Sequence, residues 1–160
     1  MGHPLGCPFY RVKRMVTWTT PKTNRQASYD EDGNYTGDYF SYDDFNRIRN
    51  NLDALSELGA QLYFLNFTAQ LPNTKSVTGY PFASDINAFE TRLHELNNQT
   101  IRLPIGTKQT FVDNGAFIGF AELNRIESAM VTMYKMFNDA LGGRKMLKFR
   151  LGLPSSAIRF

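Results

Sequence analysis

Three segments of this chain repeat one six-residue pattern: an acid, an apolar residue, Asn, any residue, an apolar residue and a charged residue. The pattern occupies residues 44–49, 85–90 and 122–127, and further apolar residues follow four and seven places after the second apolar one. The three asparagines are separated by 41 and 37 residues. A period near forty, with apolar residues at three- and four-residue steps, is typical of an array of helical units.

The outer two copies carry clear helix boundaries. The first helix is predicted over residues 42–65, with Ser41 as its cap and Asp44 completing a capping box. The third is predicted over residues 119–141, where Gly142-Gly143 is expected to end it. Both segments carry an apolar stripe long enough to bury one face against a neighbour.

The middle copy and the connecting segments give weaker signals. The middle helix is predicted over residues 84–97 with Ser84 as its cap, which breaks the alignment with the other two copies. Short strands are predicted over residues 15–20, 101–112 and 145–151, the last from a clean alternation of apolar and basic residues. The fold class expected is therefore mainly α with a small β component (α+β).

Length and charge indicate the organisation of the chain. With 160 residues, 42% of them hydrophobic, we expect residues 15–160 to form one domain of three repeat-like helical units. Residues 1–14 form a basic leader that we expect to be disordered or an extension. Residues 15–100 hold 6 basic and 11 acidic groups, whereas residues 101–160 hold 9 basic and 4 acidic groups. This asymmetry favours the two halves facing each other, within one subunit or between neighbours.

The sequence offers no catalytic, cofactor or metal-binding constellation. Its only two histidines, His3 and His94, are far apart in the sequence and its single cysteine, Cys7, lies in the leader, which argues against a transition-metal site. Asp30, Asp32 and Asn34 resemble the start of a calcium loop, but Gly33 stands at the fourth place instead of the sixth and the closing Glu is absent. We therefore expect no cofactor and no enzymatic activity.

The repeated asparagines, Asn46, Asn87 and Asn124, admit two interpretations. An amide side chain can donate and accept hydrogen bonds, so the three could form a ladder that binds a ligand. Alternatively, an Asn near a helix start can bond the backbone of a neighbouring loop and fix how each unit docks, and we favour this second interpretation. Arg47 and Arg125, which follow two of them, are expected to make surface or interhelical salt bridges and not to bind anions.

Several short motifs resemble one family. The chain reads Trp-Thr-Thr-Pro-Lys-Thr-Asn over residues 18–24, Asp-Phe-Asn-Arg-Ile over residues 44–48 and Leu-Asn-Arg-Ile-Glu over residues 123–127. This resembles small proteins encoded near the tail genes of phages and prophages of Gram-positive bacteria. Arg25 stands where that family usually has Trp, and the segment 30–37 looks inserted. The resemblance implies a virion structural part and carries over no active site.

Two functions follow from these observations. The first is a non-enzymatic component of a phage virion, in the tail, baseplate, fibre base or connector, assembled in the host cytoplasm with copies of itself and other tail proteins. The alternative is a small nucleic-acid-binding or regulatory protein that uses the basic C-terminal half. The longest apolar runs are far shorter than a membrane span, so no membrane partner is expected.

The C-terminal segment is the expected interface. An alternating strand followed by an apolar tail is a candidate for strand addition to a partner or for docking in a groove. The alternative is that the tail folds back over the first helix of its own chain. The candidate interface residues are Leu147, Phe149, Leu151, Ile158 and Phe160.

Overall fold

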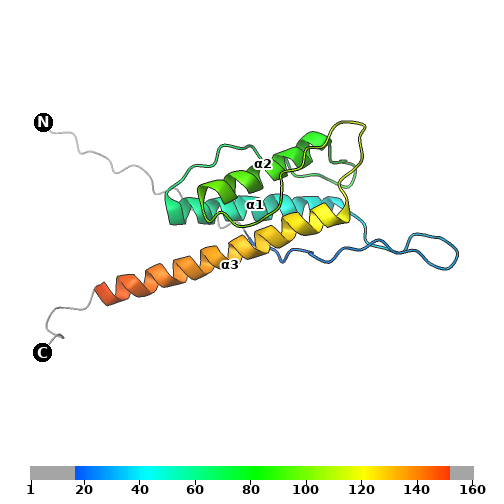
Figure 1. Ribbon diagram of the computed structural model, residues 1–160. Coiled ribbons are helices and arrows are strands. Elements are labelled where there is room, and N and C mark those ends of the chain that lie inside the picture. Colours follow the sequence, from blue (N-terminus) through cyan, green and yellow to red (C-terminus); the bar gives the residue numbers. More distant parts are fainter. Residues whose placement is uncertain (1–16, 152–160) are drawn as a thin grey trace, which may run out of the picture.

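The computed structural model describes the backbone of residues 17–151 and the side chains of residues 17–143, and it is mainly helical. The helices are α1 (Tyr42–Tyr63), α2 (Ala83–Gln99) and α3 (Phe120–Leu151), and they pack together (Figure 1). The small β component was a wrong prediction for this part of the chain, because its described residues form only an isolated bridge between Tyr29 and Tyr35. The leader 1–14 lies outside the described residues, as do Ile158 and Phe160.

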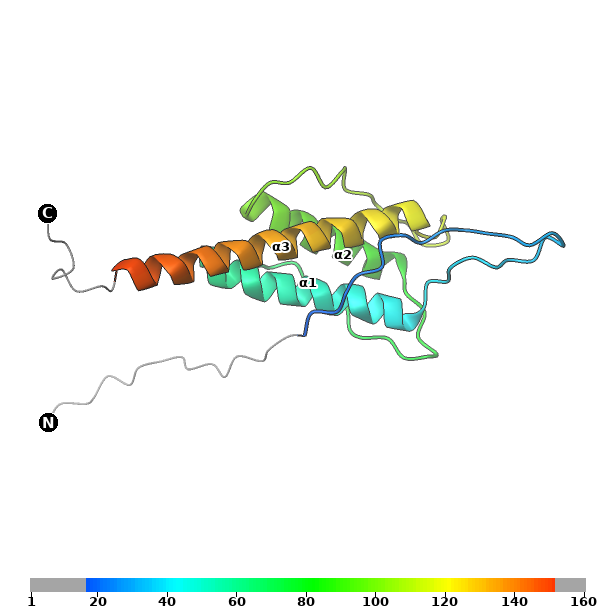
Figure 2. The ribbon, with the colours of Figure 1, turned by 90° about the horizontal axis from the view of Figure 1, so that it is seen from below.

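The three helices run in the same direction, so their N-terminal ends lie together at one end of the bundle (Figures 1 and 2). Side-chain contacts agree: the rings of Phe45 and Phe89, near the starts of α1 and α2, are 4.8 Å apart. At the other end of α1, the ring centroids of Tyr63 and of Phe137 in α3 are 6.0 Å apart. Parallel neighbours need long connections, and residues 64–82 and 100–119 return along the bundle (Figure 2).

The capping predictions hold for α1 and fail for α2. The Ser41 hydroxyl accepts a hydrogen bond from the Asp44 backbone at 3.2 Å, and the Asp44 carboxylate accepts one from the Ser41 backbone at 3.0 Å. The prediction of Ser84 as a cap is wrong, because Phe82 precedes the first helical residue and Asp85 accepts a hydrogen bond from the Phe82 backbone at 2.9 Å. This places α2 in the same alignment as α1 and α3.

The core is built from the repeated apolar positions. From each helix, the two apolar residues of the motif and the two that follow it are buried, and they form one cluster. Its members from the repeat are Phe45, Ile48, Leu52, Leu55, Ile86, Phe89, Leu93, Leu96, Leu123, Ile126, Met130 and Met133. Removing these side chains from water supplies the main driving force of the fold.

Helix α3 is longer than the sequence predicted. The predicted strand over 145–151 is wrong, because α3 continues through Gly142 and Gly143 to Leu151. Two helical glycines cost only about 1 kcal/mol each, and the Arg-Lys-Met-Leu-Lys segment that follows consists of good helix formers. Five alternating residues do not outweigh that continuation. Leu147, Phe149 and Leu151 therefore lie on helical backbone. None of the helices in the described part of the chain is long and apolar enough to cross a membrane.

Candidate functional site

The three asparagines of the repeat occupy equivalent positions in the structure. Asn46, Asn87 and Asn124 are each the fifth residue of their helix. The acid of the motif is the third residue in every case, and in α1 and α3 an arginine is the sixth. The internal repeat is therefore a repeat of helix position as well as of sequence, which makes a comparison of the side-chain contacts meaningful.

Each asparagine binds both backbone polar groups of one loop residue. The amide oxygen of Asn46 accepts from the Lys75 N–H and its amide nitrogen donates to the Lys75 carbonyl, both at 2.8 Å. Asn87 holds Phe111 in the same way at 2.8 Å for both bonds. Asn124 holds the backbone of residue 25 at 3.0 Å for both. The bonds to neighbouring loops expected from the sequence are present.

We call each such pair of hydrogen bonds an asparagine clamp. The three clamps connect the helices and loops in a cyclic order. Asn46 of α1 holds the loop that leads into α2, and Asn87 of α2 holds the loop that leads into α3. Asn124 of α3 completes the circle by holding the segment that leads into α1. Each clamp uses the donor and the acceptor of the amide together, so the contacts correspond to the docking interpretation and not to a ligand ladder.

Two further clamps were missed by the sequence analysis. Asn51 of α1, which is fully buried, holds the backbone of Thr19 at 2.9 and 2.7 Å. Asn97 of α2 holds the backbone of Leu103 at 2.7 and 2.9 Å. Neither residue belongs to the repeated motif. The available signal was their place directly beside the apolar stripe, next to Leu52 and Leu96, where an uncharged polar residue needs a partner.

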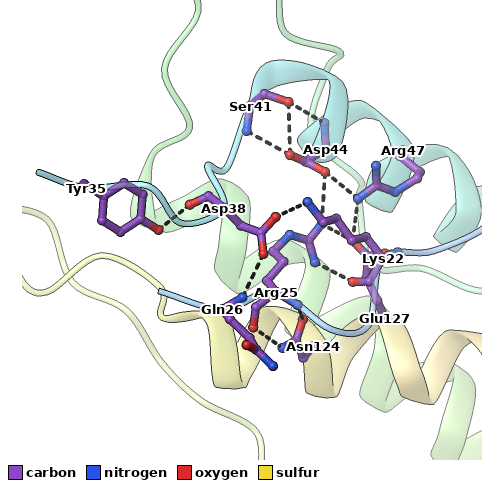
Figure 3. Close-up of polar contacts among 10 residues, drawn as sticks. All are labelled: Lys22, Arg25, Gln26, Tyr35, Asp38, Ser41, Asp44, Arg47, Asn124 and Glu127. Carbon is purple, nitrogen blue, oxygen red and sulfur yellow. Dashed lines mark hydrogen bonds and ion pairs between the residues drawn. The ribbon is translucent and has the colours of Figure 1, made fainter. Parts of the chain in front are cut away.

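A buried ion cluster lies where the N-terminal segment crosses between α1 and α3 (Figure 3). The guanidinium of Arg25 contacts the carboxylates of Asp44 at 3.0 Å and Glu127 at 2.7 Å. Arg47 contacts the same two carboxylates at 2.5 and 2.9 Å. The side chains of Arg25 and Glu127 are 0% exposed. Two cations and two anions balance one another, and this arrangement makes the burial of four charges possible.

The cluster shifts the pKa values of Asp44 and Arg47. Burial by itself would raise the pKa of Asp44, but hydrogen bonds from Ser41, Arg47 and Arg25 outweigh burial and lower the pKa from 3.8 to about 2. Burial opposes the charged form of Arg47, yet Glu127 and Asp44 raise its pKa. Both shifts favour the charged forms of Asp44 and Arg47, as expected of a structural ion network and not of a proton-transfer site.

A second cluster joins α3 to α2. Arg125 donates to the Glu122 carboxylate at 2.6 Å, to the carbonyl of Ile105 at 3.0 Å and to the carboxylate of Glu90. Burial raises the pKa of Glu90, against the opposing effect of Arg125. Arg125 and Arg47 therefore both make interhelical salt bridges, as expected from the sequence.

The interhelical ion pairs of the two clusters join residues at equivalent helix positions. Arg47, the sixth residue of α1, binds Glu127, the eighth of α3. Arg125, the sixth of α3, binds Glu90, the eighth of α2. The third link would join the corresponding residues of α2 and α1, but the sixth residue of α2 is Ala88. The bundle is thus an approximate threefold arrangement of one unit, with one of its three ionic links absent.

The residues of the calcium-like pattern form a turn. The Asp30 carboxylate accepts hydrogen bonds from the backbone of Asp32 at 3.0 Å and of Asn34 at 2.7 Å. The Asn34 side chain donates to the same carboxylate at 3.0 Å. Among the described residues, no group of three or more His, Cys, Asp or Glu side chains is arranged to hold a metal ion.

A hollow of about 390 Å³, lined mostly by apolar residues, lies between the start of α2 and the loop before α3. The residues that line it include Phe82, Ile86, Phe111, Val112, Phe117 and Ile118. The polar lining side chains are Asp113 and Asn114, so the hollow lacks the converging acid–base groups of a catalytic site.

Comparisons with known proteins identify no relative: no family model matches the chain, and no curated protein or solved structure matches it either.

Proposed function

We propose that this protein is a non-enzymatic structural component of a phage virion, located in the tail at the baseplate, fibre base or connector. The proposal starts from the resemblance of the 18–24, 44–48 and 123–127 motifs to small tail-associated proteins. One observation carries it further: the polar residues of these motifs use their hydrogen-bonding groups to join segments of the fold. Side chains committed in this way support an assembly part, because their polar groups already bond within the fold.

The three motifs contact one another. Trp18 stacks on Tyr134 of α3, with ring centroids 3.9 Å apart and an interplanar angle of 3°. The backbone of Lys22 donates to the Glu127 carboxylate, which also binds Arg47. The resemblance therefore falls on the residues that unite the N-terminal segment, α1 and α3. A pattern located there supports a scaffold, and we place the assembly function on the surface that this scaffold presents.

Mass spectrometry of purified particles from the source strain tests the proposal. We expect the chain to co-purify with intact particles through a density gradient, at a stoichiometry that matches the other tail proteins. Disruption of the gene should yield particles that lack a complete tail assembly. The matched control is a chain that carries Asn138→Leu, an exposed position, which should be incorporated normally. Particles that contain none of this protein and assemble without it would contradict the proposal.

A nucleic-acid-binding function is the second candidate, and one observation favours it. The last turns of α3 carry Arg144, Lys145, Lys148 and Arg150, and α3 projects beyond the end of α1 (Figure 1). Binding to random duplex should then weaken steeply as salt rises, because each phosphate contact releases counterions. A gel-shift titration at several salt concentrations distinguishes the two candidates, and no shift at low salt excludes this one.

A further inference from the structure

The two ends of the parallel bundle differ in shape. At the end where the helices begin, the hollow is open and is surrounded by exposed side chains, among them Phe82, Val112 and Phe117. Tyr80, in the loop before α2, is also exposed. Large apolar side chains gathered around a hollow are uncommon on a surface that contacts only water.

The opposite end carries a protruding aromatic residue, Phe64. Phe64 directly follows α1 and is 88% exposed, the highest value among the large hydrophobic residues of the described chain. Its backbone is left-handed, with φ of 56°, and its N–H bonds the Ala60 carbonyl at 2.9 Å. A non-glycine residue in this conformation costs of the order of 1 kcal/mol, so the fold places an aromatic residue there against both backbone and solvation preference.

The charges at the two ends are opposite. The end with the hollow carries Asp113 at its rim and the acidic turn of residues 30–32, in a hairpin that extends beyond the helices (Figure 2). At the other end α3, with 32 residues against 22 in α1, continues past Phe64 by roughly 15 Å at 1.5 Å per residue. Its last turns are basic, with Arg144, Lys145, Lys148 and Arg150.

We propose that the protein associates head to tail with a second copy of itself. Phe64 of one copy enters the hollow between α2 and the 111–118 loop of the next, and the basic end of α3 lies against the acidic hairpin end. A cavity of about 150 Å³ is enough to hold benzene, so the hollow of about 390 Å³ has room for the Phe64 ring. The inference deepens the proposed function by naming its self-contact, and it rests on that function only for its biological setting.

The contact is heterologous, because the two surfaces are different and lie at opposite ends of one molecule. Such a contact leaves a free hollow and a free Phe64 on every pair, so growth continues into a ring or a filament. The opposite charges favour this orientation over head-to-head or tail-to-tail pairs, in which like charges would meet. Association is therefore expected to weaken as salt rises.

Sedimentation velocity over a range of concentrations tests the inference. The full chain should form species larger than dimers at low salt. Phe64→Glu should weaken association about tenfold or more, and so should Phe117→Glu, because each buries a charge in an apolar contact. An equimolar mixture of these two variants should form a dimer and stop there, since only one intact Phe64 surface and one intact hollow can meet.

Val131→Glu is the matched control, because Val131 is an exposed apolar residue on the side of the bundle, and its association should equal that of the unaltered chain. Unchanged thermal melting of the exposed-site variants excludes unfolding as the cause of any loss. A monomeric full chain at low salt, or a mixture of variants that fails to pair, overturns the inference. Absence from virions with intact self-association would instead contradict only the proposed function.

Discussion

The Asn124 side chain binds both backbone polar groups of Arg25, 99 residues earlier in the chain, at 3.0 Å each. Only Asn offers a donor and an acceptor at this reach, because Asp lacks the donor and Leu lacks both. The clamp places Arg25 over α1 and α3, where its guanidinium meets Asp44 and Glu127. One amide thereby fixes the segment that carries the central cation of the ion cluster.

Asn124→Leu should lower the free energy of unfolding by about 1–3 kcal/mol, because it leaves the N–H and carbonyl of Arg25 without partners. Asn46→Leu should act similarly through Lys75. Urea denaturation followed by circular dichroism measures both. Asn138→Leu, at an exposed position of α3, is the control and should stay within about 0.5 kcal/mol. Equal values for Asn124→Leu and the control would refute the structural role of the clamps.

Glu127→Gln should be more destabilising than the loss of a clamp. Glu127 is fully buried and binds both Arg25 and Arg47, so its neutral form leaves the pair of cations with one carboxylate. Removing one partner of a buried ion pair costs about 3–5 kcal/mol. Denaturation at neutral pH measures the change, with Asp139→Asn on an exposed part of α3 as the matched charge-removing control. A loss below 1 kcal/mol would show that the cluster contributes little net stability.

The sequence predicted the features that depend on local periodicity. Ile48, Phe89 and Ile126 are buried because each is the seventh residue of an amphipathic helix, which the apolar spacing alone indicates. It did not predict that the helices are parallel, because a periodic stripe is equally apolar in either direction. The direction depends on the long 64–82 and 100–119 connections and on the bonds that hold them.

The role of Arg25 could not be predicted from its neighbours, because the groups that neutralise it lie 19 and 102 residues away. The strand predicted over residues 145–151 was wrong for the opposite reason. Their alternation is a local signal, but continuing an existing helix needs no new nucleus, so α3 extends through them.

The pKa of Asp44 predicts one component of acid unfolding. Its folded value of about 2 lies below the ordinary 3.8, so the carboxylate stabilises the fold above pH 3.8 and that contribution is lost as pH falls through 2. The difference corresponds to about 2 kcal/mol. Stability measured from pH 6 to pH 2 should therefore fall less steeply for Asp44→Asn than for the unaltered chain. Parallel pH profiles for the two proteins would contradict the assignment.

His94 should cause a second loss of stability on acidification, in a less acidic pH range than Asp44. Burial lowers the pKa of its imidazole below 6.5, and the charges of Arg125 and Lys108 act in the same direction. Glu90 does not offset them, because its carboxylate lies 3.6 Å from the ring nitrogen and is already bound by Arg125. The unfolded chain therefore binds the proton more readily, and stability should decrease as pH falls from 6.5 through the lowered pKa.

NMR titration of the His94 imidazole should give a pKa below 6.5, and His94→Gln should flatten the stability profile in that pH range. Because Asp44→Asn alters only the more acidic range, the two variants should change separate parts of the curve. An imidazole that titrates above 6.5 would mean that Glu90 pairs with His94 after all.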